Sequence, residues 1–402
     1  HNCPAFQKLE SEVGGISFPS VKEQRDAMCF TEINGGQGQG QRQGQEEKED
    51  CPWMLSVAEM GIQAKSPRGC LADEVWLASF VPPNHHSFFH HRVYIDLPHK
   101  KLTHLRTVSQ GQFGYIELAR YDTVGGSMEV YVKRPILDAI GAGQEERRSR
   151  MTVYEPCLQQ MVRQGFARCG LPDHVPRVLE VFVLHRGEIC FAMEEVEGGV
   201  VMDAYLREEG QTIEEVSRRI MEILWHVAVM VSVMNDRLGV NHRDLKPSNF
   251  LLRRRMDPVT HTVPVEGMPD ASLTWQTTLH LSLIDFGFAC AGSLETRRAH
   301  LSLSAVYSRA DPCPKDGRDM FLFLGYLYSD YHKTMTQELR GWFEEWLAIP
   351  GSDLCGFLRK DNDISKRWLY YLSGSENVFQ LRSCPVTVLR RLLLVLGHGG
   401  GT

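Results

Sequence analysis

The sequence predicts an α+β fold in which an antiparallel sheet comes first along the chain and helices follow. A strand, a glycine-rich turn and a second strand are predicted within Leu105–Tyr121, and Met128–Arg134 is predicted to form the next strand. Arg177–Val183 and Gly187–Val196 are predicted as two more strands of the same sheet. Thr212–Leu238 is predicted as a long helix, because apolar residues recur along one side of it at helical spacing.

Length and composition limit the classes of protein to which the chain can belong. With 402 residues, of which 43% are hydrophobic, the chain can bury a large core in one domain or two. Its net charge of −6 gives no support for a nucleic-acid partner. No apolar run is long enough for a transmembrane helix, so no membrane partner is expected. The start at His1 shows no signal-peptide pattern and indicates a fragment or a processed product.

The cysteines indicate a reducing compartment. There are 11 of them, an odd number, and none stands in a paired CxxC spacing. Scattered cysteines of this kind are typical of reduced thiols in a cytosol-like compartment, so a cytoplasmic location is expected.

Residues 1–100 form an N-terminal region with few structural signals. Residues 35–50 are of low complexity and are predicted to be a flexible linker or a disordered loop. Residues 51–100 contain apolar groups for a small subdomain or for packing on the domain that follows. Four histidines suggest either a metal site or a His-rich surface turn: His85, His86, His90 and His91. The surface turn is favoured, because no Cys or acidic residue stands at ligand spacing.

The segment Val240–Leu252 carries the strongest functional signal. It fits the pattern His-Arg-Asp-Leu-x-x-x-Asn with His242, Arg243, Asp244, Leu245 and Asn249. The segment therefore resembles the catalytic loop of the eukaryotic-type protein kinases. In phosphoryl transfer one carboxylate takes or orients the attacking hydroxyl, and a further ligand holds magnesium on the phosphates. The resemblance implies the first role for Asp244 and the second for Asn249. It also implies that Lys246, typical of serine/threonine kinases, neutralises the γ-phosphate.

The turn at residues 109–116 resembles the glycine-rich loop of the same family. The family pattern is G-x-G-x-x-G-x-V, and this chain has Ser109, Gly111, Gly114 and Ile116 at its fixed positions. Ser stands in the first glycine place. Gly111 and Gly114 would let the backbone close over the phosphates of ATP, because a Cβ there would collide with them.

The strand after this turn carries the next motif. Val-Tyr-Val-Lys at residues 130–133 stands where the family has Val-Ala-Ile-Lys, which implies that Lys133 is catalytic and binds the α- and β-phosphates. Tyr131 replaces the small Ala of the family in the roof over the adenine. Residues two apart in a strand share a face, so Tyr131 is expected to point inward with Lys133. Its ring would either narrow the nucleotide pocket or fill it.

A helix that supplies a Glu partner for Lys133 should follow this strand. Glu155 is the favoured candidate, because apolar residues follow it at helical spacing. Glu145 and Glu146 are nearer in sequence but begin a solvated charge run. Pro156 suits the first turn of a helix, so Glu155 is expected near a helix start rather than in mid-helix.

Two more motifs extend the resemblance. Met-Glu-Glu-Val at residues 193–196 resembles the segment that joins the lobes of a kinase. This implies that Met193 lies behind the adenine and that the backbone of Glu194 and Val196 binds the base. The Asp-Phe-Gly motif that begins at Asp285 implies that this carboxylate holds magnesium across the β- and γ-phosphates.

Residues 288–318 stand in the place of the family's activation segment. Four hydroxyl groups in it are candidates for phosphorylation: Thr296, Ser302, Ser304 and Tyr307. The planar guanidinium of Arg243 would pair with a phosphate there. The family's Ala-Pro-Glu anchor is not visible in this segment. Asp319 matches the Asp that begins the central helix of the C-lobe and braces the catalytic loop.

The resemblance implies a two-lobed kinase fold. The N-lobe, an antiparallel sheet plus one helix, would cover residues 101–197, and a mainly helical C-lobe would cover residues 198–402. Residues 253–276 are predicted to be a solvated surface insertion between two short strands, since loops tolerate insertion at small entropic cost. The part after Asp319 is abbreviated and similar to that of some kinases of large DNA viruses. A viral chain would be located in the host cell or the virion.

The resemblance implies transfer of the γ-phosphoryl group of ATP, with Mg²⁺, to Ser or Thr hydroxyls of a protein substrate. Two alternatives stay open. A pseudokinase that binds a nucleotide or a partner is favoured by Tyr131, by the missing anchor and by Gln159, which stands four residues after Glu155 where the family usually has an apolar residue. The intact Lys133, Asp244, Asn249 and Asp285 oppose it. The other alternative is a small-molecule kinase of the same broad fold, which Lys246 and the wording of the catalytic loop oppose.

Overall fold

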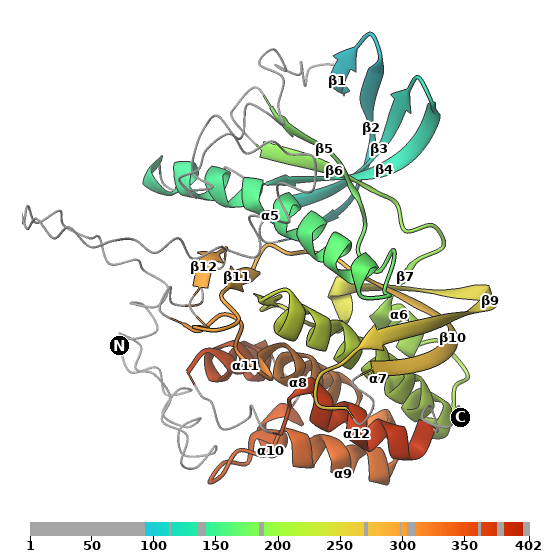
Figure 1. Ribbon diagram of the computed structural model, residues 1–402, viewed down its shortest axis with the longest axis vertical. Helices are drawn as coiled ribbons and strands as arrows, with labels where there is room; N and C mark the ends of the chain where they lie inside the picture. Colours follow the sequence, from blue (N-terminus) through green and yellow to red (C-terminus); the bar gives the residue numbers. More distant parts are fainter. Residues whose placement is uncertain are drawn as a thin grey trace, which may run out of the picture.

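The computed structural model describes residues 93–396, apart from residues 112–113, 136–141, 185–188, 269–271, 298, 304–306, 308–310, 361–362 and 376–381. This described part has a mixed α/β structure, with a curled antiparallel sheet at one end and a largely helical part at the other (Figure 1). The predictions for residues 35–50 and for the four histidines between residues 85 and 91 lie outside the described residues.

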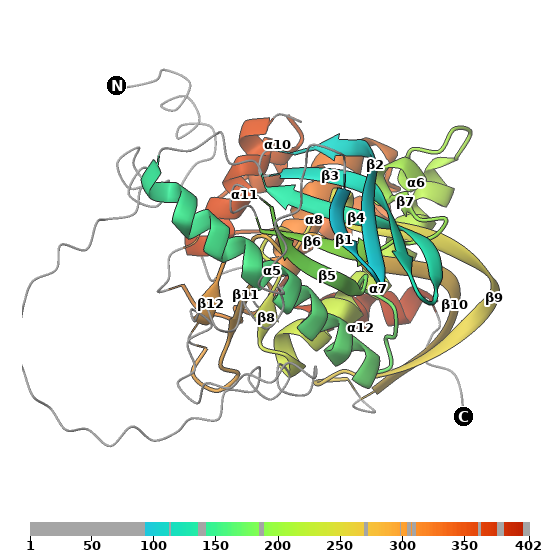
Figure 2. The same ribbon diagram turned by 90° about the horizontal axis from the view of Figure 1, so that it is seen from above.

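The sheet has six strands, all paired antiparallel, in the order β1-β2-β3-β4-β6-β5. The strands are β1 (Val93–Leu97), β2 (Lys100–Gln110), β3 (Gly114–Thr123), β4 (Gly126–Pro135), β5 (Val178–Val183) and β6 (Ile189–Glu194). Helix α5 (Ala142–Arg168) follows β4 and packs against β5 and β6 (Figures 1 and 2). Every strand predicted for this part of the chain is present, and β1 is an additional one.

The two faces of β4 have different surroundings. Val130 and Val132 are fully buried on one face, in an apolar cluster that includes side chains of β1, β2 and β6. Tyr131 packs on the other face, against the apolar cluster that contains Phe191 of β6. Successive residues of a strand alternate between faces, so Lys133 projects from the same face as Tyr131. That face turns toward α5, which contributes to the same cluster.

The helical part is built around α7 (Ile213–Arg237), which corresponds to the predicted long helix. The helix begins with a capping box, in which Thr212 Oγ1 accepts the Glu215 amide and Glu215 Oε2 accepts the Thr212 amide. The other helices of this part are α6 (Met202–Leu206), α8 (Arg318–Tyr331), α9 (Gln337–Trp346), α10 (Leu354–Leu358), α11 (Asp363–Ser375) and α12 (Pro385–Leu396). Among the helices described, none has the length and apolarity needed to cross a lipid bilayer.

The segment after Asn249 corrects one prediction. Residues 253–276, expected to be a solvated insertion, lie within a long antiparallel hairpin of β9 (Phe250–Pro264) and β10 (Ser272–Leu283). The hairpin curves along the outside of the helical part (Figure 2). Its Leu273 and Trp275 side chains are buried in the hydrophobic core of the helical part. Alternation of apolar and polar residues is the signal of such a strand. The polar outward positions, rich in Thr, concealed it.

Strands β7 to β12 form two smaller sheets of three strands each. The first has the order β10-β9-β7, in which β7 (Val200–Val201) pairs with β9. The second has the order β12-β11-β8, with β8 (Val240–Asn241), β11 (Cys290–Gly292) and β12 (Ala299–Ser302). The second sheet therefore joins the residues just before His242 to the segment that follows Asp285.

A disulfide corrects the prediction about cysteines. Cys290 of β11 is bonded to Cys313, which precedes α8, across 23 residues of sequence. Both side chains are fully buried. The prediction of reduced thiols is therefore wrong for this pair. Spacing in the sequence could not reveal the bond, because the fold, rather than a CxxC motif, brings the two residues together.

Candidate active site

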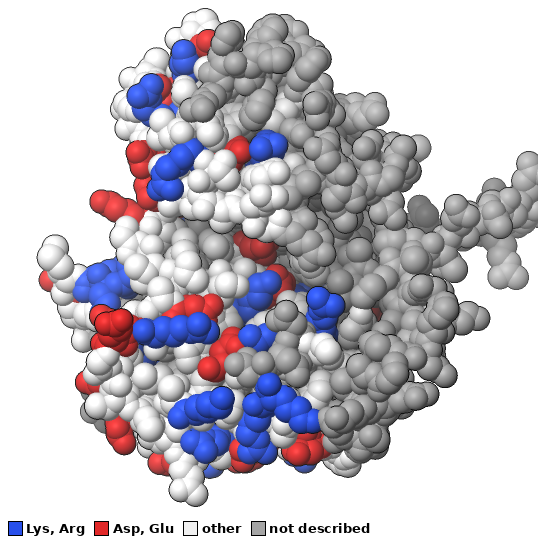
Figure 3. All heavy atoms as spheres, turned by 180° about the vertical axis from the view of Figure 1, so that it is seen from behind, with Lys and Arg blue, Asp and Glu red and all other residues white. Residues whose placement is uncertain are grey.

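Three residues singled out by the motifs meet between the sheet and the helical part. Lys133 of β4 places Nζ 2.5 Å from Oε1 of Glu155 in α5 and 2.7 Å from Oδ1 of Asp285, which follows β10. Lys133 and Glu155 are largely buried, whereas the Asp285 side chain is 41% exposed. One cation thus bridges an interior carboxylate and one that is open to a ligand. On the face seen in Figure 3, charges of both signs are mixed where the two parts meet.

Burial and mutual charge set the protonation of these three side chains. Burial alone would lower the pKa of Lys133, but the carboxylates of Asp285 and Glu155 outweigh it and raise that pKa. Burial would raise the pKa of Asp285, yet Lys133 holds it well below the usual range. For Glu155, burial dominates and raises the pKa despite Lys133. At neutral pH the ammonium is therefore charged and Asp285 is ionised, the state in which a carboxylate binds a cation.

Helix α5 positions Glu155 differently from the prediction. Pro156 lies inside the helix, so Glu155 is in mid-helix and not near a helix start. Pro156 lacks an amide hydrogen and so removes one hydrogen bond without ending this helix. Further along, Gln159 is buried and its Nε2 donates to the carbonyl of Pro176 at 2.9 Å. This bond satisfies the polar side chain and ties α5 to the loop before β5.

The catalytic-loop residues form one hydrogen-bonded group around Asp244. Lys246 Nζ lies 3.0 Å from Oδ1 and 2.8 Å from Oδ2 of this carboxylate. Asn249 Nδ2 donates to the Asp244 carbonyl at 2.8 Å and to Oδ2 at 3.1 Å. A single 3-10 turn, Pro247–Asn249, returns the chain toward Asp244. The spacing of the motif therefore reflects a local turn that brings the amide of Asn249 back to the carboxylate.

Asp319, at the start of α8, holds the backbone of this loop. Its Oδ1 accepts the amide of Arg243 at 2.8 Å, and its Oδ2 accepts the amide of His242 at 2.9 Å and Nδ2 of Asn241 at 3.1 Å. Arg243 has a φ of 65°, a left-handed conformation that residues other than glycine rarely adopt. The fully buried carboxylate offsets this backbone strain. The predicted contact between Asp319 and the loop is present.

A tyrosine that the sequence did not indicate also contacts Asp244. Tyr370 of α11 donates its hydroxyl to Oδ1 of Asp244, across 126 residues of sequence. Tyr326 of α8 donates in turn to the Tyr370 hydroxyl at 3.0 Å. No local pattern marks Tyr370, because a tyrosine on an amphipathic helix ordinarily serves for packing.

The glycine-rich turn lies beside β4. Strand pairing sets Ser109 opposite Ile116, and Ile116 opposite Lys133. Gly111 donates its amide to the carbonyl of Gly114 at 2.9 Å and so closes the turn. A Cβ on Gly114 would lie 2.6 Å from the carbonyl oxygen of the residue that follows Lys133, whereas one on Gly111 would make only an ordinary contact. The requirement for glycine at residue 114 therefore already comes from packing of the neighbouring strand.

Tyr131 lies where the strand register placed it. It pairs with Met193 in the adjacent strand, and its half-buried side chain is on the face that carries Lys133. Burial, and after it the nearby Glu195 carboxylate, raises the pKa of Tyr131. Tyr131 therefore stands on the strand of Lys133 and packs against the cluster that contains Met193, the first residue of the segment predicted to bind the base.

That segment begins at the end of β6. Glu194 donates its amide to the carbonyl of Arg177 at 2.9 Å, and its Oε1 accepts the Arg177 amide at 2.8 Å. These two bonds fasten the segment to the residue before β5. Beyond them, the carbonyl of Val196 accepts the amide of Gly199 at 2.9 Å, which forms a turn leading to β7.

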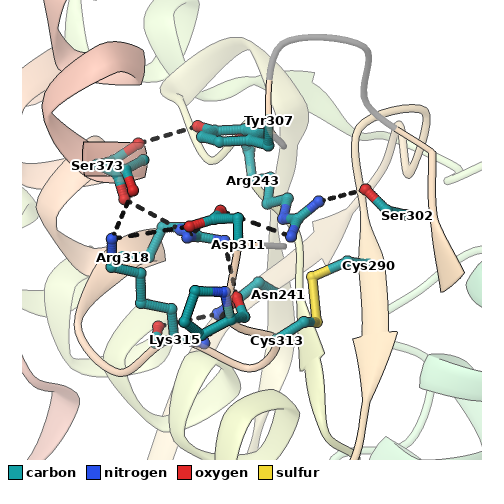
Figure 4. Close-up of polar contacts among 12 residues, drawn as sticks. Asn241, Arg243, Cys290, Ser302, Tyr307, Asp311, Cys313, Lys315, Arg318 and Ser373 are labelled. Carbon is teal, nitrogen blue, oxygen red and sulfur yellow. Dashed lines mark hydrogen bonds and ion pairs between the residues drawn. A yellow bond between two sulfur atoms is a disulfide. The ribbon is translucent and has the colours of Figure 1, made fainter. Parts of the chain in front are cut away.

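Arg243 reaches into a buried charged cluster below the catalytic loop (Figure 4). Its Nη1 donates to Ser302 Oγ at 2.6 Å, and its Nη2 lies 3.7 Å from Asp311. Arg318 pairs with the same Asp311 carboxylate. Burial, and after it the neighbouring Arg318, lowers the pKa of Arg243 to about 10. Two buried guanidinium groups therefore share one carboxylate.

The hydroxyl groups predicted as phosphorylation candidates have different surroundings. Ser302 Oγ accepts a hydrogen bond from the guanidinium of Arg243. Tyr307 is buried and bonded to Ser373 Oγ at 2.9 Å, so it packs α11 against this segment (Figure 4). Thr296 is exposed. Ser304 lies outside the described residues.

Comparison with known proteins gives partial likenesses to plant protein kinases. No family model matches the chain. The chain is 30% identical over 149 residues to CBL-interacting serine/threonine-protein kinase 21 of Arabidopsis thaliana, a stretch covering 37% of this chain and 30% of that protein. It is 25% identical over 271 residues to CBL-interacting protein kinase 1 of Oryza sativa subsp. japonica, a stretch covering 65% of this chain and 52% of that protein.

These likenesses support a protein kinase family for the chain. The curled antiparallel sheet and the helices that follow it are compatible with a kinase fold. The chain matches 30% of the length of the first relative and 52% of the length of the second. Activity, substrate and cofactors of this chain are therefore matters for proposal and experiment.

Proposed function

We propose that the protein is an ATP-dependent serine/threonine protein kinase, which transfers the γ-phosphoryl group of ATP to Ser or Thr hydroxyls of protein substrates. The observation that carries the proposal is the position of Lys133 Nζ, 2.5 Å from Glu155 and 2.7 Å from Asp285. A fixed cation for the phosphates, beside an ionised carboxylate for magnesium, is an arrangement that phosphoryl transfer requires.

The two functional loops are joined, which supports a single site. The amide of Ile284 donates to the Asn249 carbonyl at 3.0 Å, and His242 Nε2 lies 3.1 Å from the Ile284 carbonyl. Asp285 therefore follows a residue that is bonded twice to the catalytic loop. These bonds hold Asp285, a partner of Lys133, close to the loop that carries Asp244.

Under this proposal the protein has a two-lobed kinase fold. Residues 101–197, with the sheet and α5, would be the N-lobe, and residues 198–402 the C-lobe. The position of α5 against the sheet supports this division. The β9–β10 hairpin would then be an elaboration of the C-lobe.

ATP would lie between the glycine-rich turn and the Lys133 group. The strand pairing that brings Ile116 opposite Lys133 supports this placement of the turn. The residues proposed to contact ATP are Ser109, Gly111, Gly114, Ile116, Tyr131, Lys133, Glu155, Met193, Glu194 and Val196.

Magnesium would be held by Asp285 and Asn249 together with the phosphates. The donor set fits this ion, because Mg²⁺ takes oxygen ligands and commonly uses one or two side chains plus phosphate oxygens. Asp285 is ionised and 41% exposed, and Asn249, whose Nδ2 is turned to Asp244, has its amide oxygen for the ion. Within the described residues no cluster of three or more His, Cys, Asp or Glu could hold a metal ion. When bound, the ion would neutralise phosphate charge.

Asp244 and Lys246 would act on the acceptor side of the reaction. Asp244 would orient the attacking hydroxyl and take its proton, while Lys246 would follow the charge of the transferred group. The contacts of its ammonium with both oxygens of Asp244, at 3.0 and 2.8 Å, support this role. Most of the catalysis would come from such positioning and charge.

The proposal implies a protein substrate as partner. That the chain has neither a nucleic-acid nor a membrane partner stays a prediction. A cytoplasmic location, in the host cell or virion if the chain is viral, stays a prediction. The Cys290–Cys313 bond weakens the cysteine argument for it, because disulfides are rare in reducing compartments.

A transfer assay tests the proposal. The purified chain is incubated with γ-labelled ATP, magnesium and dephosphorylated casein, and Lys133→Met and Asp285→Asn serve as matched inactive variants. Label on casein Ser or Thr is expected with the wild type and in neither variant. Full activity of either variant would refute its assigned role. Label on added aminoglycosides or small alcohols in place of casein would point to a small-molecule kinase instead.

Tyr131 favours a second candidate function, that of a pseudokinase that binds a nucleotide or a partner. Its ring lies on the face of β4 that carries Lys133, where it takes up space beside Met193. A pseudokinase would show no label on casein with intact folding. Calorimetric titration with ATP would then separate a nucleotide-binding module from a protein that binds no nucleotide.

A further inference from the structure

The carboxylate of Asp244 has a full set of hydrogen-bond donors. Lys246 approaches both oxygens, Asn249 donates to Oδ2, and Tyr370 donates to Oδ1. A carboxylate offers about four lone-pair sites, and these contacts number four. The Asp244 side chain is only 5% exposed. An acceptor hydroxyl therefore has no vacant position on this carboxylate until one donor leaves.

The donors differ in how they are held. Lys246 and Asn249 belong to the same short loop as Asp244, and Asn249 also donates to the Asp244 backbone carbonyl at 2.8 Å. Tyr370 comes from α11 and touches Asp244 through its hydroxyl. Its side chain is half-buried, so one side of it faces solvent. Tyr370 is therefore the donor that can withdraw without dismantling the loop.

We propose that Tyr370 caps Asp244 by occupying the hydrogen-bond position that the acceptor hydroxyl must take, so that a protein substrate displaces the phenol to react. The inference rests on the proposed kinase function. In this exchange the hydrogen bond from the Tyr370 hydroxyl to Oδ1 of Asp244 is replaced by one from the Ser or Thr hydroxyl of the substrate. The exchange conserves the number of hydrogen bonds to the carboxylate, so it costs little in solvation.

Two contacts keep the cap in place. Tyr326 donates to the Tyr370 hydroxyl at 3.0 Å, which orients it toward Asp244 as a donor. The ring of Phe288 lies 6.4 Å from that of Tyr370, centroid to centroid, at 43°. Phe288 belongs to the segment after Asp285, so the cap packs against the part of the chain that a peptide substrate would approach. Burial, and after it the Asp244 carboxylate, raises the pKa of Tyr370, which keeps the phenol protonated and donating.

The test is the steady-state kinetics of Tyr370→Phe, which keeps the ring and removes the hydroxyl. Tyr371→Phe, on the same helix, is the matched control, and Tyr326→Phe removes the outer donor. With dephosphorylated casein as acceptor, Tyr370→Phe is expected to lower the KM for casein about tenfold, the worth of one hydrogen bond to a charged group. The KM for ATP and kcat should not fall. Tyr326→Phe should act in the same direction with a smaller effect.

Three results would count against the cap. A fall of tenfold or more in kcat with an unchanged KM for casein would show that Tyr370 positions Asp244 for catalysis. Equal kinetics in Tyr370→Phe and Tyr371→Phe would show that the hydroxyl has no part in acceptor binding. Absence of transfer in every variant, including the wild type, would refute the proposed function and the cap with it.

A thermal unfolding cycle tests the contact without activity. Tyr370→Phe, Asp244→Ala and the double variant are compared with the wild type, and the two shifts in Tm should not add, because each single variant already removes the bond between the two side chains. Additive shifts would show that the hydroxyl and the carboxylate do not interact in solution, and would overturn the proposal even if the chain proves to be an active kinase.

Discussion

The carboxylate of Asp319 accepts the backbone amide of Arg243 at 2.8 Å, across 76 residues of sequence. The adjacent amide of His242 donates to the other oxygen of the same carboxylate at 2.9 Å. The conformation of the catalytic loop therefore depends on the first turn of α8. The left-handed backbone at Arg243 makes this dependence strong, because that conformation is unfavourable without an external partner.

Asp319→Asn is expected to lower the free energy of unfolding by about 3 kcal/mol. The NH2 group of the new side chain cannot accept a hydrogen bond, so it leaves a buried backbone N–H of the loop without its acceptor. Equilibrium urea unfolding measures the change. Asp316→Asn is the matched control, since Asp316 is half-exposed and pairs with Arg297 at 3.1 Å near the surface. The control should change stability by less than about 1 kcal/mol. Equal losses in the two variants would contradict the bracing role of Asp319.

Trp275→Ala is expected to lower the free energy of unfolding by about 4 kcal/mol, the usual range for a large side chain removed from a core. Trp275 is 3% exposed and lies edge-on to Trp225 of α7, with ring centroids 5.9 Å apart. Gln276→Ala, at the next and outward-facing position, should be nearly neutral. Urea unfolding of the two variants decides whether the hairpin is a packed part of the helical core or a dispensable attachment.

Tyr131→Ala is expected to tighten ATP binding by about 1 kcal/mol, because removing the ring relieves crowding in the space proposed for the base. Titration calorimetry with ATP on both proteins measures the change. Glu129→Ala, an exposed position on the same strand, should leave the affinity unaltered. An affinity that stays the same or weakens in Tyr131→Ala would mean that the ring supports the nucleotide instead of crowding it.

Acid is expected to destabilise the contact between the hairpin and the loop before β5. His280 of β10 and His174 of that loop lie ring to ring, with centroids 4.6 Å apart. Burial, and after it Arg255 and Arg253, lowers the pKa of His280 to about 3, and burial also lowers the pKa of His174. Such groups bind fewer protons when folded than when unfolded. Stability is therefore lost as pH falls below the unfolded value of about 6.5.

For His280 the expected loss is about 2 kcal/mol between pH 7.5 and pH 5. Urea unfolding at the two pH values measures it. In His280→Gln the difference between the two pH values should shrink by about that amount, whereas His104→Gln, in β2 and outside this pair, should retain the full difference. A pH dependence that is the same in both variants would show that His280 is not responsible.

Local motifs made much of the candidate site predictable. The turn that returns Asn249 to Asp244 spans a few residues, so its geometry is already contained in their spacing. The Lys133–Glu155 contact was predictable for another reason. A lysine on a strand needs a carboxylate partner, and Glu155 was the acidic residue followed by apolar residues at helical spacing. Pro156 nevertheless led to a wrong prediction of where the helix begins.

The parts that escaped prediction depend on distant packing. Tyr370 reaches Asp244 across 126 residues, and no periodicity in α11 distinguishes it from a packing residue. The hairpin was concealed because polar residues fill its outward positions, although Leu273 and Trp275 carried the alternating signal. The cysteine pair likewise needed the fold itself, since β11 and the segment before α8 become neighbours only after folding.

The covalent link between Cys290 and Cys313 decides which motions the intervening segment can make. One anchor lies in β11, which is paired on both sides with β8 and β12, and the other lies just before α8. A segment that is held at both ends cannot move away from the rest of the protein as a single hinged unit. The bond confines its displacement to the residues between Cys290 and Cys313. The distance between the two ends of this segment is therefore set by the covalent bond.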